Sequence, residues 1–371
     1  MLGLLHRSKT RKEPFDFAQI VGSCTEAGRK AGANWDNVNL ADGSNQRAQG
    51  LASYFVDFHN GLLGKNMAGL LEPSASLANY RALELARELT GKNKVLCSNL
   101  SHVSIARACD ALKLEPIVLD AKPSENYQVH EDQVAKAVSE HSGDIAAIVS
   151  TYGTTQLGHI EKLAESDLVK QLRSEGAWLH VDAAYGGYVE RLSKHIKAKI
   201  PDADSITIDP YKFVGKPGIA LLLVDRAKVP KHNVEYYVHS PLTVHTTLSA
   251  GPVAAWGQTV IDCGDVYGLR EIADQCVEIA KRSGTDLQRQ RVPLVHPVEM
   301  SIVPIALNSS VEANSVHRKL LNDGFSVGKV HIEGGDYNVN GIRMVVTPKV
   351  NPDLMYGTAS ALIQKIIELV K

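Results

Sequence analysis

Up to Asp225, short apolar runs alternate with longer amphipathic segments along the chain. The runs are apolar at nearly every position, which is typical of strands buried on both faces of a sheet. They are Lys94–Ser98, Pro116–Leu119, Ala146–Thr151, Trp178–Asp182, Ser205–Ile208 and Ile219–Val224. Apolar residues recur at helical spacing in Ser76–Leu89, Glu131–Glu140 and Ile160–Glu175. This alternation predicts an α/β fold with a mostly parallel central sheet and helices on both faces.

The pattern differs at the two ends of the chain. Residues 15–70 are predicted to be mostly helical, and Pro252–Arg291 reads as a long helical segment. Beyond it, strands are expected at Glu299–Leu307, Gly328–Glu333 and Gly341–Thr347, with helices near Glu312–Asn322 and Pro352–Val370. We therefore predict a helical segment at 1–60, a large α/β domain at 61–250, and a linking helix with a small C-terminal α+β domain at 251–371.

The composition narrows the class of partner. The 371 residues include 40 basic and 41 acidic side chains, so the net charge is −1 and no strongly basic face for nucleic acid is expected. No apolar run reaches the roughly 20 residues of a membrane span. The 5 cysteines lack C-x-x-C spacing and the histidines lack metal-ligand spacing, so we predict no metal and no disulfide framework. A cytoplasmic protein is expected.

Two of the predicted strands lead into side chains that one flat cofactor can use. Asp182 ends Trp178–Asp182, and Lys212 follows soon after Ser205–Ile208. A buried carboxylate needs a cation or a donor beside it, and a protonated pyridine ring is such a partner. A desolvated lysine amine can hold an aldehyde as a Schiff base. The pair therefore indicates pyridoxal 5′-phosphate.

Each of these two residues also has a simpler interpretation. Asp182 could be a structural aspartate that caps the next turn, and Lys212 could be a surface lysine. Lys216 is the local competitor for the Schiff base. We favour Lys212 because it lies closer to the end of the strand pattern, where ligands gather in open α/β sheets.

Small and polar residues at other predicted strand ends and helix starts extend this site. Ser74, Ala75 and Ser76 precede a helix whose N–H groups could bind the phosphate, although serine at such a position usually only caps the helix. His102 could stack on the cofactor ring opposite the small Ala184. A capping or core histidine is the alternative.

Two further side chains are candidates for contacts with cofactor or substrate. Thr154 follows Ala146–Thr151 and could supply a hydroxyl to the cofactor's phenolic oxygen or to the substrate. Arg343 lies in Gly341–Thr347 and could bind a substrate carboxylate with both arms of its guanidinium. An exposed strand arginine is an almost equally good interpretation.

Together these segments resemble the group II pyridoxal-phosphate-dependent amino acid decarboxylases, most closely their archaeal tyrosine/aspartate branch. The family has the fold-type-I, aspartate aminotransferase-like fold. The resemblance extends over residues 15–370 and is carried by Ser101–Ser104, Gly153–Thr155 with Gly158, His180–Gly187, Ser205–Lys212 and Ile342–Pro348. The aspartate and lysine segments are highly specific in combination, and the others support them.

The resemblance implies a role for individual residues. Lys212 would hold the cofactor, Asp182 would bind its ring nitrogen and His102 would stack on its ring. The residues expected to contact the cofactor as well are Ser74, Ala75, Ser76, Thr154, Ala184, Ser205, Tyr211, Thr247 and Ser249. Arg343 and Tyr237 are expected at the substrate, and Tyr236 or Tyr237 is a candidate for the acid that reprotonates the α-carbon.

The family also implies a homodimer with active sites at the subunit interface, where Thr246–Ser249 would reach the partner's phosphate. The chain departs from the family pattern at three places. Glu72–Asn79 keeps only the end of the usual phosphate loop, and Tyr211 stands where most members have histidine. An arginine often found near residues 248–252 is absent.

The expected activity is decarboxylation of an L-amino acid, tyrosine-like or aspartate/glutamate-like, to its amine. Two alternatives stay open. One is another pyridoxal-phosphate reaction, such as a carbon–carbon or carbon–sulfur lyase or an aminotransferase, because the bond that breaks depends on how the substrate is oriented. The other is a non-catalytic protein that keeps the fold, which the altered phosphate loop would suit.

Overall fold

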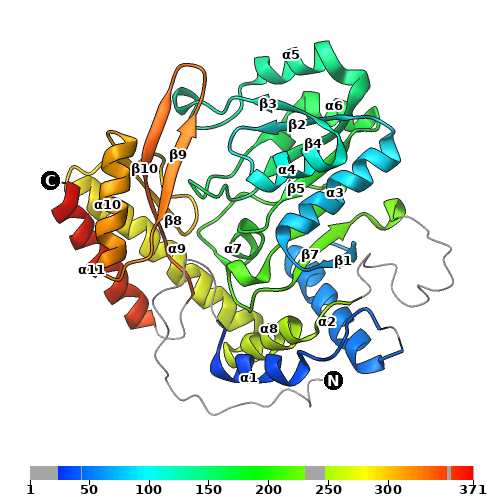
Figure 1. The fold of residues 1–371 in the computed structure, drawn as a ribbon, viewed down its shortest axis with the longest axis horizontal. Coiled ribbons are helices and arrows are strands. Elements are labelled where there is room, and N and C mark those ends of the chain that lie inside the picture. Colours follow the sequence, from blue (N-terminus) through cyan, green and yellow to red (C-terminus); the bar gives the residue numbers. More distant parts are fainter. Residues whose placement is uncertain (1–23, 43, 230–246, 349–351, 371) are drawn as a thin grey trace.

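A seven-stranded sheet covered by helices forms the larger part of the molecule (Figure 1). The structure is a computed structural model that describes residues 24–42, 44–229, 247–348 and 352–370. The strand order is β1-β7-β6-β5-β4-β2-β3. The strands are β1 (Ala68–Glu72), β2 (Lys94–Ser98), β3 (Glu115–Leu119), β4 (Ile145–Thr151), β5 (Trp178–Asp182), β6 (Ser205–Ile208) and β7 (Ala220–Val224).

Strand direction decides where polar side chains can meet. The β3-β2-β4-β5-β6 pairings are parallel, whereas β7 runs antiparallel to both β6 and β1. The carboxyl ends of every strand except β7 therefore lie at one edge of the sheet. Ligands gather at this edge in open α/β sheets.

Helices pack on both faces of the sheet because buried side chains alternate between them along each strand. Val95, Ala147 and Trp178 pack against α3 (Ala75–Thr90) and α4 (Val103–Leu112). Leu96, Ile148 and Leu179 pack on the opposite face against α5 (Glu131–His141) and α6 (Asp167–Ser174). The predicted mostly parallel sheet with helices on both faces is thus confirmed.

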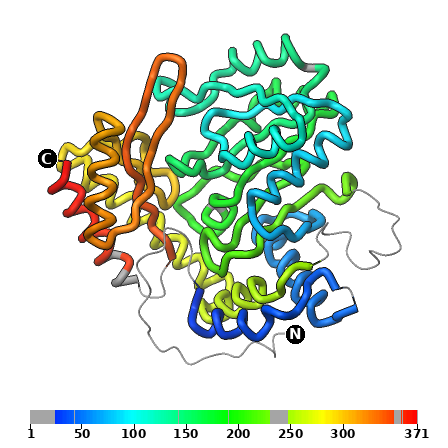
Figure 2. The backbone as a smooth tube through the Cα atoms, in the orientation of Figure 1, coloured from blue at the N-terminus to red at the C-terminus, as the bar shows by residue number. Residues whose placement is uncertain are grey.

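The remaining described helices and strands flank this sheet. In Figure 2 the chain from α1 (Glu26–Trp35), in blue, runs beside α8 (Gly251–Asp262), and the Leu40 N–H donates to the Leu248 carbonyl at 2.7 Å. A small antiparallel sheet in the order β8-β10-β9 packs against three helices. These elements are β8 (Ile302–Leu307), β9 (Gly328–Glu333), β10 (Asn338–Val345), α9 (Asp265–Arg289), α10 (Ser310–Asn322) and α11 (Pro352–Val370).

Three predicted segments differ most from the structure, and the strands predicted at Glu299–Leu307 and Gly341–Thr347 are instead Ile302–Leu307 and Asn338–Val345. Residues 15–70 include a strand, β1, because Ala68–Glu72 pairs with β7. The helix predicted over Ile160–Glu175 begins only at Asp167, where the Ser166 side chain caps it. The helix predicted over Pro252–Arg291 is interrupted at Gly264, which adopts φ 91° between α8 and α9. The division at 1–60, 61–250 and 251–371 stays a prediction.

None of the helices in the described ranges combines the length and apolarity that crossing a bilayer requires.

A buried series of hydrogen bonds connects α2 (Gln46–Leu63) to α7 (Gly186–Leu192) and α8. His59 is fully buried; its Nδ1 lies 2.6 Å from the Phe55 carbonyl oxygen, and its Nε2 bonds the Tyr188 hydroxyl. The Trp256 indole N–H donates to the same hydroxyl at 2.9 Å. Every donor finds an acceptor only if His59 is neutral, with its proton on Nδ1. Burial lowers the pKa of His59 from 6.5 to about 4, against a smaller opposing effect of the Phe55 hydrogen bond.

Acidification is therefore expected to destabilise the fold through His59. A histidine whose folded pKa lies below its unfolded value binds fewer protons when folded, so stability is greatest above pH 6.5 and falls as the pH drops toward about 4. At pH 5 the loss due to His59 should be about 2 kcal/mol. Urea denaturation of His59→Gln between pH 7 and pH 5 should show a shallower pH dependence. His130→Gln, at an exposed histidine, is the matched control, and equal slopes in all three proteins would contradict the assignment.

Candidate active site

Five of the predicted site residues follow or end different strands but gather at the carboxyl edge of the large sheet. Ser74 follows β1, His102 follows β2 and Thr154 follows β4. Asp182 is the last residue of β5 and lies opposite Thr207 of β6, which leads into Lys212. The backbone keeps β5 and β6 joined beyond their ends, because the Ala183 N–H donates to the Thr207 carbonyl at 3.1 Å.

Asp182 is a buried carboxylate, only 5% exposed. One oxygen accepts from the Asn79 amide at 2.8 Å and the other from the Ala184 N–H at 3.1 Å. Among the described residues, no lysine, arginine or histidine lies within ion-pairing distance of it. Burying an anion with only neutral donors is costly, so this carboxylate suits a cationic ligand.

Asn79 connects Asp182 to a directed chain of buried hydrogen bonds. The Trp178 indole N–H donates to Ser205 Oγ at 2.8 Å, and Ser205 lies 2.9 Å from Nδ1 of His180. His180 Nε2 lies 3.1 Å from Asn79 Oδ1. If each donor meets an acceptor, His180 is neutral with its proton on Nε2, and the Asn79 amide must point its NH₂ group at Asp182. Burial lowers the pKa of His180 to about 4, against the raising effect of Asp182.

Asn79 and His180 were not among the predicted site residues. For His180 the sequence does hold a signal, which is its spacing from Asp182. His180 lies two positions before Asp182 on one strand, so both side chains face the same side of the sheet. Ser205 belongs to this buried chain at the start of β6, beside His180. Its hydroxyl bonds Trp178 and His180, and its predicted cofactor contact stays a prediction.

His102 lies beside the same amide. Its Nδ1 accepts from the Ser104 N–H at 3.2 Å and lies 2.8 Å from the Ser104 hydroxyl, which itself accepts from Asn79 at 3.0 Å. His102 therefore caps α4, as the simpler interpretation predicts, and its second nitrogen has no hydrogen-bond partner among the residues that the structure describes. Burial lowers the pKa of His102; the charge of Lys212 lowers it further, whereas Asp182 raises it. These charged groups thus lie close enough to act on one imidazole.

Lys212 is half-buried and ends a short turn, Pro210–Lys212. The Lys212 N–H donates to the Asp209 carbonyl at 3.1 Å, and the Tyr211 N–H donates to the Asp209 carboxylate at 3.2 Å. Burial raises the pKa of Asp209 to about 6, opposed by Lys212 and reinforced by Asp182. The charges of Lys212 and Asp182, the two residues that the cofactor would join, therefore both act on the Asp209 carboxyl group. Tyr211 is half-buried beside Lys212.

The start of α3 offers free backbone donors. Ser74 caps the helix by accepting from the Leu77 N–H at 3.3 Å. In the described part of the chain, neither the Ala75 nor the Ser76 N–H has an acceptor, so both can bind an anion. Ala75 also packs against Ala184 and Ala220, which joins this helix start to the segment after Asp182.

Three of the other predicted cofactor contacts lie in different surroundings. Thr154 is fully buried, and its hydroxyl accepts from the His159 N–H at 3.1 Å. Ser249 donates to the Asp36 carbonyl at 3.0 Å, so its hydroxyl joins the start of α8 to α1 within one chain. Thr247 is exposed. Tyr236, Tyr237 and Thr246 lie outside the described residues.

Arg343, on β10, is a half-buried cation that lacks an anionic partner within the part of the chain that the structure describes. Its Nε is buried without a hydrogen bond, and its guanidinium reaches only the Lys329 carbonyl, at 3.5 Å. Burial lowers the pKa of Arg343, whereas Tyr185 raises it. Arg343 also acts electrostatically on His102, so the small sheet brings a positive charge toward the edge of the large one.

These features fit pyridoxal phosphate. Among the described ranges, Asp182 is a buried anion that lacks a cation, Lys212 supplies an amine, and the start of α3 supplies N–H groups that have no acceptor and could bind a phosphate. His102 contacts Ser104, which also bonds Asn79, and Ala184 packs against Ala75 at the start of α3.

Comparison with known proteins agrees with this reading. Residues 74–251 match the family model described as the pyridoxal-dependent decarboxylase conserved domain. A probable L-tyrosine/L-aspartate decarboxylase of Methanothermobacter thermautotrophicus is 27% identical over 78% of this chain and 83% of the relative. An L-aspartate decarboxylase of Thermococcus kodakarensis is 26% identical over 92% of this chain and 90% of the relative.

The fold itself also has solved counterparts. Glutamate decarboxylase of Lactobacillus brevis superposes with a TM-score of 0.79, covering 95% of this chain and 87% of that one. The sequences are 17% identical, so this likeness concerns the fold, and it confirms the fold-type-I architecture.

Proposed function

We propose that this chain converts an L-amino acid of the tyrosine or aspartate/glutamate class to its amine, with Lys212 as the cofactor-binding lysine. The chain belongs to the pyridoxal-dependent decarboxylase family and is an amino acid decarboxylase that uses pyridoxal 5′-phosphate. The observation that carries the proposal is that the site contains two charged side chains of opposite sign, each without a charged partner of its own among the residues described. Within the residues that the structure describes, Asp182 is a buried anion without a cation, and Arg343 is a half-buried cation without an anion. A cationic ring and an acidic substrate would complete both.

Each residue has a separate task in this proposal. The bound cofactor supplies a ring that accepts the electrons left behind when carbon dioxide departs. Asp182 keeps the ring nitrogen protonated, and Asn79 holds that carboxylate in place through its amide. His102 covers the ring, with Nδ1 fixed by Ser104. The N–H groups of Ala75 and Ser76 bind the phosphate.

The decisive assay supplies purified protein and pyridoxal phosphate with single amino acids. Tyrosine, aspartate and glutamate are tested first, and carbon dioxide and amine are measured together. Equal amounts of both products from one of these substrates support the proposal. A keto acid without carbon dioxide, or a sulfide, would identify a different pyridoxal-phosphate reaction. A complete lack of product from every amino acid tested, with cofactor bound, would favour the non-catalytic alternative.

Arg343 is proposed to bind a carboxylate of the substrate. Arg343→Gln removes the charge, so the KM of the amino acid should rise about 10- to 100-fold, with a smaller change in kcat. Lys329→Ala is the matched control, because Lys329 lies opposite Ile342 on the neighbouring strand and its ammonium bonds only Asn314 among the described residues. Steady-state kinetics of the two variants test the role. An unchanged KM in Arg343→Gln would exclude it.

We also propose a cytoplasmic homodimer whose active sites lie at the subunit interface. The exposed Ser76 and Thr247 side chains support this assembly, because a partner could cover both. Sedimentation of the cofactor-loaded protein should give the mass of two chains.

A further inference from the structure

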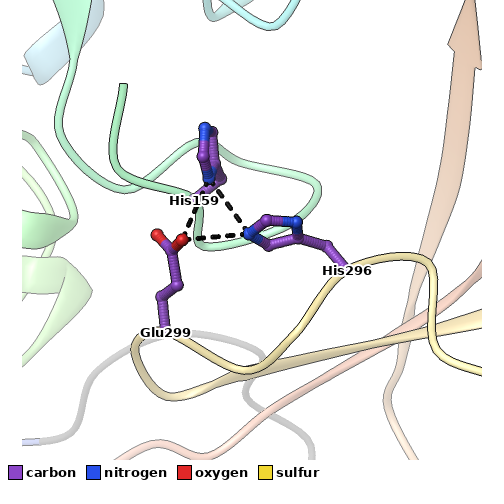
Figure 3. Close-up of side chains that lie close together, drawn as sticks. All are labelled: His159, His296 and Glu299. Carbon is purple, nitrogen blue, oxygen red and sulfur yellow. Dashed lines mark hydrogen bonds and ion pairs between the residues drawn. The ribbon is translucent and has the colours of Figure 1, made fainter. Parts of the chain in front are cut away.

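A second cluster of chemically active side chains lies between the large sheet and the small one. Figure 3 shows His159, His296 and Glu299 pointing toward one another. His159 Nδ1 lies 3.1 Å from His296 Nε2 and 3.3 Å from Glu299 Oε1, and these last two atoms are 3.1 Å apart. The histidines are 1% and 4% exposed, and Glu299 is 32% exposed. The spacing of histidines along the chain does not predict this cluster.

The three contacts among His159, His296 and Glu299 cannot all be hydrogen bonds at once. Each ring nitrogen carries at most one proton, and an ionised carboxylate carries none. If one nitrogen is protonated, the other faces Glu299 Oε1 as lone pair against lone pair. If both are protonated, both N–H groups can donate to Glu299 Oε1, but the two ring nitrogens then face each other at 3.1 Å without a hydrogen bond. With neither protonated, all three contacts join lone pairs. A central cation would make all three atoms ligands at once.

The size of the triangle matches a zinc ion. Zinc binds histidine nitrogen at about 2.0–2.1 Å and carboxylate oxygen at similar distances, so ligands in a tetrahedral site are roughly 3.3–3.4 Å apart. The observed separations of 3.1 to 3.3 Å need only a slight expansion. Two histidines with one glutamate form an open zinc site, and the exposed side of Glu299 leaves room for a water as fourth ligand. Imidazole ligands disfavour magnesium and calcium.

The surrounding backbone holds these ligands in place. The Ile160 N–H donates to the second Glu299 oxygen at 2.7 Å. In the described region, His159 Nε2 is buried without a partner, so the polar contacts of this ring come from its Nδ1. Gly158 adopts φ 66°, and a Cβ there would lie 3.0 Å from the Cβ of Ile302 at the start of β8. The loop after β4 is therefore packed closely against the segment that bears His296 and Glu299.

We propose that His159, His296 and Glu299 bind a divalent transition-metal ion, zinc foremost, which fastens the loop after β4 to the segment before β8. The loop is the one that carries Thr154, whose hydroxyl accepts from the His159 N–H. The metal is structural: it links the two sheets and takes no part in breaking the substrate's bond. The proposal is independent of the decarboxylase activity.

The test uses the tag-free, cofactor-loaded protein after dialysis against a chelator and then against metal-free buffer. Zinc is added, unbound metal is removed, and the bound metal is counted by elemental analysis. About one zinc per chain is expected. At zinc about a hundredfold above Kd, the melting temperature should rise by roughly 4 °C. Cobalt in place of zinc should give the visible absorption of a tetrahedral site.

Matched variants assign the metal to this cluster. His296→Ala and Glu299→Gln should each reduce bound zinc from about one per chain to nearly none and remove the thermal shift. The second keeps an oxygen that can accept from the Ile160 N–H, so its fold should persist. His331→Ala, in the exposed His331–Glu333 pair, should bind zinc like the parent. Lys212→Ala should also bind zinc normally, which separates this site from the cofactor site.

Three results would overturn the proposal. The first is a parent protein that holds no zinc and shows no thermal shift. The second is zinc retained by both ligand variants, because the metal would then lie elsewhere, for instance on a cysteine. The third is equal loss of zinc in His331→Ala.

Discussion

Lys212→Ala is expected to lower kcat at least about a thousandfold and to remove the visible absorption of the lysine-bound cofactor. Lys212 acts on both His102 and Asp209, which border the edge where Asp182 ends β5. Loss of this amine should change little else, because the side chain is half-buried on a turn formed by backbone hydrogen bonds.

Lys216→Ala provides the matched control. Lys216 was the competing lysine in the sequence, but its ammonium lies 3.0 and 3.1 Å from the two carboxylate oxygens of Asp36. This pair joins two partly exposed side chains at the surface, so losing it should cost at most about 1 kcal/mol and leave kcat within about twofold. Normal turnover in Lys212→Ala, or equal loss in both variants, would refute the lysine assignment. Unchanged melting curves exclude misfolding as the cause.

Much of the large sheet can be predicted from sequence because its strands are short, apolar and buried on both faces. The bounds of β2, β5 and β6 were predicted as the structure has them. The position of Asp182 and Lys212 follows from the same pattern, since parallel strands bring their carboxyl ends to one edge. Two local segments therefore sufficed to indicate the cofactor.

Interactions between distant segments could not be predicted in the same way. Asn79, on α3, reaches Asp182 at the end of β5 across 103 positions of sequence, and His159 meets His296 across 137. Neither pair leaves a local pattern, because their contact depends on how α3 and the small sheet dock. The strand β1 was missed for a related reason. Ala68–Glu72 is a strand because β7 lies beside it, and its apolar residues also fit a helix.

Asp182→Asn is expected to lower kcat about 10²- to 10³-fold while the cofactor still binds to Lys212. The physical reason is the loss of a fixed negative charge that keeps the ring nitrogen protonated. The amide also fits the existing hydrogen bonds poorly. Asp182 accepts from both Asn79 and the Ala184 N–H, whereas an amide has one oxygen, so one of these contacts would face an NH₂ group. A loss of stability of about 1–3 kcal/mol should accompany the loss of activity.

Asp204→Asn separates the effect of charge at the site from the effect of charge in the core. Asp204 is also buried, but it accepts from the Leu179 N–H and pairs with Lys228 near the start of β6, away from the carboxyl edge. Its replacement should lower the melting temperature and leave kcat of the folded enzyme within about twofold. Kinetics and melting curves of both variants, each saturated with cofactor, decide between the two effects. If Asp182→Asn kept the parental kcat, Asp182 could not be the group that controls the ring nitrogen, and its burial without a cation would need another ligand.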